Sequence, residues 1–435
     1  MTDVSADAAA REPEREPPRE PGPDTVTAGR QGEREPDPFR ATRWSPRVRW
    51  RLAPWWLRVM LVFAGARAIT TVFVLALASV QGANPWTAAK PGYFEFANMW
   101  DARWYQIILL SGYPSELPQT PDGHVAENAW AFMPVYPAFV GMLTWFQVPW
   151  NVASVIVSLA AGLGAALVFH RLMSRFLEPD RAMFAVVLFC VAPVSPIMQF
   201  GYAESLGYLL LATALLLLVD RRYGWLFPVI ALWSFTRPGA LAFALTLGLH
   251  WLLRWWRRRD DPFPMRERVL AASVTAFAVV FGFGWLLVAA IGTGDLHAYT
   301  DTELAWRAAY IGYGELVPFT AWFESGGWWL GQPLGSLAVV ALILAFGLLL
   351  LTPAVRRLGI DIRLWSASYA LYLLAVFFPQ SSVFRITSPL FPLLGAAAIP
   401  RARWYRWGIV IVFLALQVGW LLIAWGIDGR DWTPP

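Results

Sequence analysis

The stretch WWLRVMLVFAGARAITTVFVLALASV, which occupies residues 55–80, is the first of many long apolar blocks in this chain. A membrane-spanning α-helix needs about 20 predominantly apolar residues, and this block exceeds that length. Of the 435 residues, 57% are apolar and 15% are charged, whereas soluble domains have about 25% charged residues. The sequence therefore predicts an all-α protein that crosses the membrane many times.

Several later blocks are shorter than a full membrane span. The predicted spans are residues 55–80, 151–173, 182–200, 205–219, 224–236, 238–253, 269–291, 333–352, 363–379, 387–400 and 407–426. Residues 131–148 form one more candidate. Arg and Lys prefer the cytoplasmic side of short loops. The clusters of Arg between the apolar blocks all lie on the cytoplasmic side only if residues 131–148 do not cross the membrane. We therefore predict about 11 transmembrane helices and an interfacial helix at 131–148.

The two ends of the chain differ from its apolar part. Residues 1–48 are rich in Arg, Glu, Pro and Asp, so they cannot bury enough surface to fold. We predict a disordered cytoplasmic tail at 1–48, a transmembrane domain at 49–427 and a short tail at 428–435. The first apolar block begins near Trp55, too late for a cleaved signal peptide, and we expect it to remain as the first helix.

Composition excludes several kinds of site. The net charge of +5 comes with Arg at the ends of apolar blocks, which indicates membrane topology, and no nucleic-acid-binding motif occurs. The lone Cys190 lies in an apolar run, so no disulfide framework or thiolate metal site is expected. No His, Asp and Glu cluster has metal-ligand spacing, and no glycine-rich nucleotide loop occurs. We predict no metal, no cofactor and no nucleic-acid partner.

The predicted topology collects ionisable residues on the outer face of the membrane, which carries the loops 81–150 and 292–332. These residues are Asp101, Arg103, Glu204, Arg237 and Arg385. Ionisable residues at membrane depth are functional candidates by default. Arg237 and Arg385 lie on the side that positive charge avoids, and a buried phosphate would account for both. Snorkelling to the interface is the ordinary alternative.

The tetrad Trp100-Asp101-Ala102-Arg103 places a carboxylate among aromatic side chains shortly after the first span. A positioned carboxylate that accepts a hydroxyl proton accelerates group transfer by about 10²–10⁴-fold. Asp101 could instead cap a helix that begins at Ala102. Glu204 could bind a sugar hydroxyl, pair with an arginine or cap a helix. Pro134 and Pro137 flank Tyr136 in a segment that is either a kinked interfacial helix or a wall of a substrate groove.

Four motifs occur in a fixed order along the chain. They are Trp100-Asp101, Phe132-Met133-Pro134-Val135-Tyr136-Pro137, Tyr202-Ala203-Glu204-Ser205 and Thr236-Arg237-Pro238-Gly239. This order resembles the PIG-V family, bacterial relatives of the second GPI mannosyltransferase within the GT-C superfamily of membrane glycosyltransferases. The resemblance implies a GT-C-like helix bundle and an inverting transfer of mannose from polyprenyl-phosphate mannose, with Asp101 as the base.

The resemblance also implies partners and site residues. Arg237 and Arg385 could bind the donor phosphate, and the acceptor would be a lipid-linked glycan, a glycolipid or a cell-wall polymer. Candidate substrate contacts are Trp100, Arg103, Tyr136, Tyr202 and Glu204. The residues after Arg237 depart from the family pattern, so the acceptor is not carried over. We expect a multi-pass protein of the inner (plasma) membrane that contacts membrane lipids and has an extracytoplasmic active site.

Two other functions are compatible with the sequence. A transporter or flippase of a lipid-linked cell-envelope intermediate would also use broken helices and intramembrane arginines. A non-catalytic scaffold of a cell-envelope complex would leave Arg237 and Arg385 without a role. We therefore favour mannosyl transfer, with the flippase as the alternative.

Overall fold

The computed structural model describes residues 46–426, which form helices joined by turns. Within this range there is no β-strand, only an isolated bridge between Gln119 and Val125. The chain divides into two compact units, Met1–Leu52 and Ala53–Pro435, and the described helix α1 (Pro46–Leu52) belongs to the first. Apart from the start of α1, the predicted tails at 1–48 and 428–435 lie outside the described residues. The site lies entirely in the second unit.

Five helical segments in the described part of the chain are long and apolar enough to cross a membrane. They are α2 (Trp55–Val80), α6 (Trp150–Met173), α11 (Met265–Gly282) continued by α12 (Gly284–Thr293), α16 (Leu334–Leu351) and α21 (Arg403–Trp425). Leu344 and Leu348 of α16 are 62% and 67% exposed, which suits contact with lipid tails. The prediction of an all-α polytopic membrane protein is confirmed.

The other predicted spans are shorter helices, several of them broken. They are α7 (Pro179–Val191) with η2 (Ser195–Gln199), α8 (Glu204–Val219), η3 (Tyr223–Trp225) with α9 (Leu226–Ser234), α10 (Ala240–Trp256), α18 (Gly359–Val376), and η4 (Ser388–Leu393) with α20 (Leu394–Ala397). Proline ends or distorts helices because it lacks an N–H and clashes with the preceding turn. Pro193 follows α7, and Pro392 lies within η4.

The break after α7 receives a buried arginine from the first span. Arg67 donates to the carbonyl oxygens of Cys190 and Ser195 and, at 3.0 Å, to Ser195 Oγ. Gln417 of α21 donates to Val191 O and to Ser195 Oγ, each at 2.9 Å. Carbonyl groups at a helix end need donors at membrane depth, so this network ties α2, α7 and α21 together.

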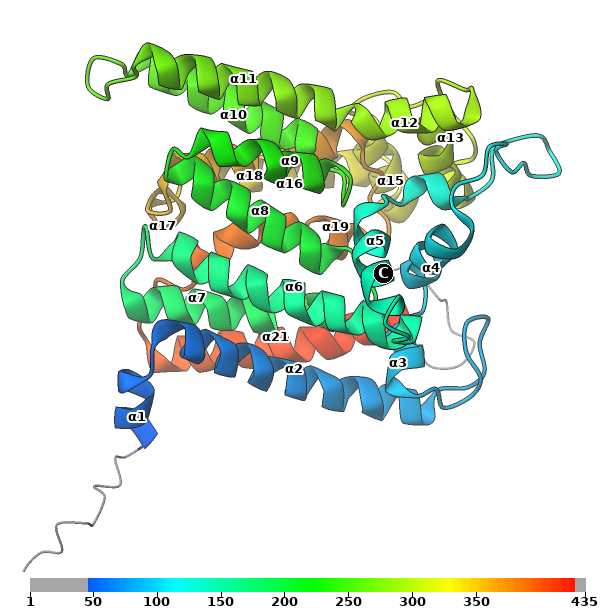
Figure 1. The fold of residues 1–435 in the computed structure, drawn as a ribbon, viewed down its shortest axis with the longest axis horizontal. Helices are drawn as coiled ribbons and strands as arrows, with labels where there is room; N and C mark the ends of the chain where they lie inside the picture. Colours follow the sequence, from blue (N-terminus) through cyan, green and yellow to red (C-terminus); the bar gives the residue numbers. More distant parts are fainter. Residues whose placement is uncertain (1–45, 427–435) are drawn as a thin grey trace, which may run out of the picture. The chain divides into compact units, whose positions relative to one another are not determined.

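The segment predicted to lie in the interface folds as η1 (Ala129–Ala131) and the 10-residue helix α5 (Val135–Thr144). At about 1.5 Å per residue, α5 is too short to cross a bilayer. Figure 1 shows α5 crossing the end of α6 instead of running alongside it. Leu109 of α4 (Asp101–Ser111) packs directly on Gly141, where a larger side chain would clash. This contact fixes α5 against α4, and both helices lie within the first predicted outer loop.

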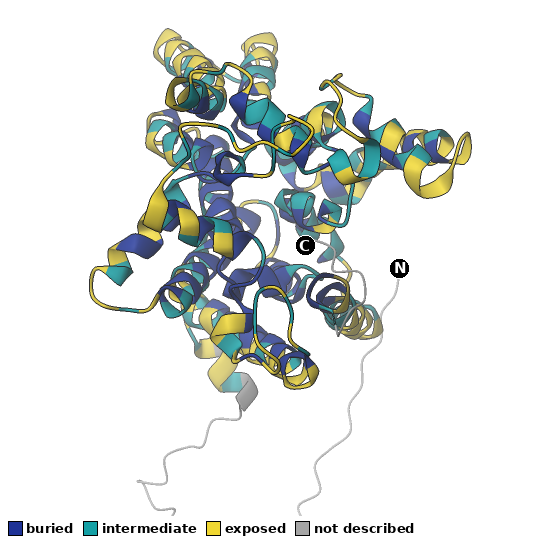
Figure 2. Ribbon diagram, turned by 90° about the vertical axis from the view of Figure 1, so that its right-hand side faces the viewer, coloured by how far each residue is buried: buried dark blue, intermediate teal, exposed yellow. Residues whose placement is uncertain are grey.

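The two predicted outer loops lie at the same end of the long helices. Figure 1 places α3 (Tyr93–Phe96), α4 and α5 there together with α12 and α13 (Ala298–Ala305), and α17 (Pro353–Arg356) at the opposite end. Asn128 Nδ2 donates to Thr302 Oγ1 at 2.8 Å, which joins the two loops directly. Figure 2 shows the buried residues in the interior of the helix bundle and the exposed ones at its periphery.

Candidate functional site

Four charged side chains from four separate segments meet at the end of the helices that carries these loops. Arg385, on α19 (Val383–Ile386), forms ion pairs with Asp101 Oδ2 and, at 2.9 Å, with Glu204 Oε1. Arg237, between α9 and α10, pairs with the same Glu204 oxygen at 3.1 Å. We call Asp101, Glu204, Arg237 and Arg385 the ionic cluster. The structure thus brings the candidate base and both candidate phosphate-binding arginines together.

Both carboxylates of the ionic cluster stand at helix N-termini. Asp101 and Glu204 are the first residues of α4 and α8, where the helix dipole favours negative charge. Neither caps its helix, because the N-cap positions belong to Trp100 and Ala203 and no side-chain cap hydrogen bond forms. The capping alternatives for Asp101 and Glu204 are therefore wrong. Their side chains pair with arginines instead.

The backbone at Trp100 has φ 59° and ψ −125°, a combination that residues other than glycine rarely adopt. Such strain costs about 1–3 kcal/mol and persists where the surroundings enforce it, often at functional sites. Trp100 Nε1 donates to Ala424 O at 2.9 Å, and its ring lies 4.6 Å from that of Trp86. Trp100 therefore anchors the turn that sets the position of Asp101.

Tyr202 and Tyr136, both predicted substrate contacts, are fully buried. The Tyr202 hydroxyl donates to Met99 O at 3.3 Å, and the Arg385 guanidinium lies 5.5 Å above the Tyr202 ring. The Tyr136 hydroxyl donates to Ser154 O at 3.1 Å. The two side chains support the site from within the core, and their contact with a substrate stays a prediction.

Arg103, another predicted substrate contact, lies apart from the ionic cluster. It is exposed and donates to Gln106 Oε1 at 3.2 Å and to Trp86 O at 3.1 Å. Together with Glu95 and Asn98 it lines a separate cavity of about 190 Å³. The structure therefore separates Arg103 from Asp101, although only one residue stands between them in the sequence.

Three further side chains belong to the site and were missed by the sequence interpretation. Tyr105 is hydrogen-bonded to Arg237. Glu303 on α13 and Tyr372 on α18 interact with the charge of Arg237 and with each other. The loop 292–332 contains several acidic residues, and the chain has 13 tyrosines, so no pattern in a single sequence distinguishes these three.

Opposing effects set the charge state of Arg237. Burial lowers its pKa, but the Glu204 carboxylate and then Tyr105 raise it, and the pKa ends above its usual value. The Arg237 side chain is 18% exposed, whereas that of Arg385 is 8% exposed. Arg237 is therefore a permanent cation and the more accessible of the two arginines.

Aromatic side chains from both outer loops pack near Tyr105, which contacts Phe132 and is hydrogen-bonded to Arg237 of the ionic cluster. The Trp104 ring stacks on Phe132 at 5.7 Å, and Trp306 contacts their edges at 6.0 and 5.8 Å. Trp104 and Trp306 are partly exposed. Aromatic rings are rigid and apolar, and Trp also carries an N–H group that can donate a hydrogen bond. This group of rings therefore offers a surface suited to a sugar ring.

An apolar cavity of about 580 Å³ is lined by residues of α7, η2, α8, α16, α17 and the broken segment η4 with α20. This volume is within the range of ligand cavities, about 300–1,000 Å³. Leu349 and Val355 line one part, and Tyr208 and Ser388 line another. Tyr208 Oη and Ser388 Oγ are 2.6 Å apart, and Ser388 Oγ donates to Arg385 O at 2.5 Å. The cavity is thus connected to the ionic cluster through hydrogen-bonded residues.

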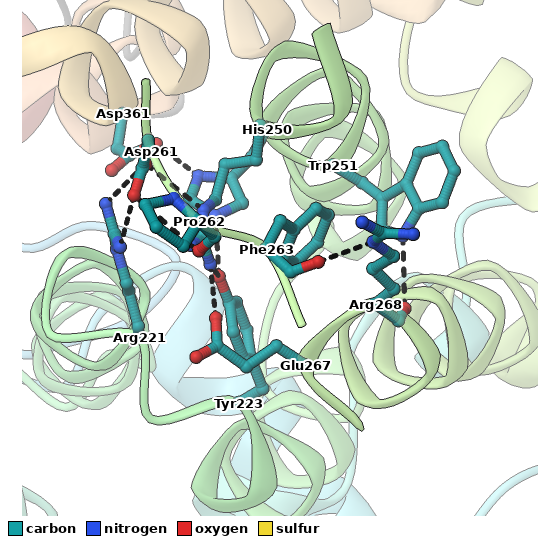
Figure 3. Close-up of polar contacts among 11 residues, drawn as sticks. Arg221, Tyr223, His250, Trp251, Asp261, Pro262, Phe263, Glu267, Arg268 and Asp361 are labelled. Carbon is teal, nitrogen blue, oxygen red and sulfur yellow. Dashed lines mark hydrogen bonds and ion pairs between the residues drawn. The ribbon is translucent and has the colours of Figure 1, made fainter. Parts of the chain in front are cut away.

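A second polar cluster ties η3, α10, α11 and α18 together (Figure 3). His250 Nδ1 lies 2.6 Å from Asp361 Oδ1, and His250 Nε2 lies 2.9 Å from Tyr223 Oη. Arg221 forms a bidentate pair with Asp261 at 2.9 and 2.7 Å. Since these groups satisfy one another, we assign the cluster a structural role. No group of three or more His, Cys, Asp or Glu in residues 46–426 is arranged to hold a metal ion.

No protein-family model and no curated protein matches the sequence. The chain is similar to ArnT from Cupriavidus metallidurans in the apo state, with 14% identity and a TM-score of 0.45, covering 81% of this chain and 62% of that one. It is also similar to the Archaeoglobus fulgidus oligosaccharyltransferase tethered with an acceptor peptide, with 11% identity and a TM-score of 0.38, covering 86% and 56%. The chain spans less than two thirds of either protein, and the likeness assigns no activity.

Proposed function

We propose that this chain is an inverting mannosyltransferase of the GT-C type, which moves mannose from polyprenyl-phosphate mannose to a lipid-linked or cell-envelope acceptor. The observation that carries the proposal is the ionic cluster, in which two arginines and two carboxylates converge beside the loops of a membrane bundle. The distribution of Arg in the sequence supports the inner (plasma) membrane as the location, with the cluster on the extracytoplasmic side.

The proposed reaction moves negative charge onto the donor phosphate. The acceptor hydroxyl attacks the anomeric carbon, the bond from that carbon to the phosphate oxygen breaks with its electron pair, and the configuration inverts. A carboxylate receives the hydroxyl proton. Removing one preorganised donor from a site of growing negative charge costs about 10²–10³-fold in rate. Arg237 would bind the phosphate first, because it is more accessible than Arg385.

The apolar cavity supports a lipid-linked donor over a soluble nucleotide sugar. Its lining is almost entirely apolar, so it suits an isoprenoid chain whose transfer from water is favoured by about 0.8 kcal/mol per buried CH₂ group. The polar pair Tyr208 and Ser388 marks the part nearest Arg385. A chain in this cavity would leave the attached phosphate near the ionic cluster.

A flippase of a lipid-linked intermediate is the second candidate function. The observation that favours it is the set of broken helices, α7 with η2 and η4 with α20. Discontinuous helices that surround a site at membrane depth are a feature of transporters. The two proposals differ in whether the bond between the anomeric carbon and the phosphate oxygen is broken.

The function is tested with the full-length protein in liposomes that contain labelled polyprenyl-phosphate mannose and candidate glycolipid acceptors. We expect the wild type to transfer mannose. The transfer rate of Asp101→Asn should be lower by at least about 10²-fold, because the Asp101 carboxylate holds Arg385 and is the base implied by the resemblance. Glu116→Gln, a carboxylate exposed in the first outer loop, is the matched control. Undiminished transfer by Asp101→Asn overturns the role of the cluster. Lipid translocation without any transfer by the wild type selects the flippase.

A further inference from the structure

Trp104 follows Asp101 by one helical turn on α4. Residues three and four positions apart on a helix are neighbours, with about 5–6 Å between their Cβ atoms. Trp104 and Tyr105 therefore lie on the same face of α4 as Asp101. Tyr105 is buried and is hydrogen-bonded to Arg237, so this face of α4 belongs to the site of the ionic cluster. Trp104 is only half-buried, and part of its ring is accessible to a substrate.

Two other aromatic rings fix the orientation of Trp104. Phe132, which is 6% exposed, stacks on one face of the Trp104 ring, with 5.7 Å between the centroids and 12° between the planes. The Trp306 ring is steeply inclined to both rings, and its centroid lies 6.0 Å from that of Trp104 and 5.8 Å from that of Phe132. Because the three distances are nearly equal, Trp306 stands beside the stacked pair and does not cover the other face of Trp104.

The position of Trp306 relative to Trp104 is set by a contact between the two outer loops. Trp306 directly follows α13, and Thr302 of α13 is hydrogen-bonded to Asn128 of the first outer loop. We call the half-buried rings of Trp104 and Trp306 the aromatic platform. A surface that is already fixed in this way loses little conformational freedom when it binds a ligand.

The chemistry of the aromatic platform matches that of a sugar ring. A hexopyranose presents C–H bonds on the faces of its ring and hydroxyl groups around its rim. The face of an aromatic ring is electron-rich and attracts such C–H groups. The indole N–H of Trp104 is not buried and donates to no group in residues 46–426, so it can donate to a sugar hydroxyl.

Anchoring in the lipid headgroup region is the ordinary role of tryptophan at a membrane interface. Trp145, which follows α5 and is 84% exposed, fits that role. Trp104 differs from it, because its ring packs inward on Phe132 and it shares a helix face with Asp101, which is only 8% exposed. Anchoring therefore explains Trp145 but not the placement of Trp104.

We propose that the aromatic platform binds a hexose ring of the acceptor, so that the acceptor is a carbohydrate and not a simple lipid alcohol or a peptide. The acceptor role rests on the proposed transferase function, whereas binding of a sugar by the platform can be measured without it. A hexose on Trp104 would lie beside Asp101. Two rings, Phe132 and Tyr105, lie between Trp104 and Arg237, so the bound sugar would stand next to the donor phosphate.

The first test measures sugar binding by full-length protein in lipid nanodiscs. Saturation-transfer NMR is recorded with methyl α-mannoside and methyl β-glucoside, and with glycerol as a polyol that has no ring. We expect saturation of the ring C–H protons of at least one glycoside and none of glycerol. Trp104→Leu should weaken this binding by at least about tenfold, because it removes the aromatic face at the centre of the surface. Trp104→Phe should bind within about threefold of the wild type, because it keeps an aromatic face.

Trp145→Ala is the control for this test and should bind the glycosides as the wild type does. Trp104→Leu keeps an apolar side chain at this position, and a melting temperature equal to that of the wild type shows that the variant is folded. The inference is overturned if the wild type binds neither glycoside, or if Trp104→Leu binds as tightly as the wild type.

The second test measures mannose transfer in the liposome assay with octyl α-mannoside and the candidate glycolipid acceptors. For whichever acceptor the wild type uses, Trp104→Leu should raise the acceptor KM by at least about tenfold and leave the KM for polyprenyl-phosphate mannose unchanged. Transfer by the wild type with an unchanged acceptor KM in Trp104→Leu overturns only the role of the platform. Glycoside binding that depends on Trp104, without transfer to any acceptor, overturns the transferase function and leaves the platform as a carbohydrate-binding surface.

Discussion

At the scale of single residues, the two arginines of the ionic cluster have different tasks. Arg385 bridges two buried carboxylates, whereas Arg237 forms an ion pair with Glu204, is hydrogen-bonded to Tyr105 and is more exposed. Arg385→Ala should destabilise the protein by about 3–5 kcal/mol, since it leaves buried charges without a partner. Arg237→Lys should fold normally and lose about 10²–10³-fold in kcat, since lysine cannot hold phosphate in a bidentate manner.

Thermal unfolding in detergent and transfer assays check this pair of variants, with Arg175→Lys as the control. Arg175 is 51% exposed and pairs with Asp220, so its replacement should change neither property. Equal melting temperatures for Arg385→Ala and wild type would contradict the bridging role. A transfer rate for Arg237→Lys that matches the wild type would contradict phosphate binding by Arg237.

The same residues show how far the sequence could predict the site. Arg237, Arg385 and Glu204 stand out because charge is rare between apolar blocks. Glu303 lies in a polar loop among other acids, so only the packing of α13 reveals it. Tyr202 was predicted as a substrate contact as part of the motif Tyr202-Ala203-Glu204-Ser205, and only the tertiary structure shows that its ring packs under Arg385.

At the scale of elements, the broken segment η4 with α20 forms a wall of the apolar cavity. If a polyprenyl chain occupies this cavity, Ala397→Trp should obstruct it. We expect KM to rise at least about tenfold for a donor with a long chain, a loss of about 1.4 kcal/mol in binding. A donor with a chain of two isoprene units should be used as well as before.

Comparison of the two donors with purified protein checks the cavity. Leu344→Trp on the exposed side of α16 is the control, because it adds the same side chain where lipid can move aside. Equal KM values for the long donor in Ala397→Trp and wild type would contradict occupation of the cavity. The sequence predicted an apolar block at 387–400 but not that it lines a cavity. Prolines shorten the helices of this block, but whether a cavity forms beside them depends on how neighbouring elements pack.

At the scale of the whole membrane unit, the sequence predicted that the loops 81–150 and 292–332 share one side of the membrane. The structure places them at one end of the helices and in contact, through Asn128 and Thr302. The distribution of arginine supports the extracytoplasmic side for this end. The proposed site depends on both loops lying on this side, because Trp104 and Trp306 reach it from different loops.

Membrane-impermeant maleimide labelling of intact cells determines this orientation. Cys190 is fully buried, so it should not react in the folded protein. Introduced cysteines in the two loops, Glu116→Cys and Glu315→Cys, should be labelled on intact cells. Arg259→Cys, between α10 and α11, should react only after permeabilisation, because it belongs to a basic loop that stays in the cytoplasm. Labelling of Arg259→Cys on intact cells would contradict the predicted topology. Labelling of only one of the two outer-loop cysteines would mean that the loops face opposite sides of the membrane and cannot form a single site.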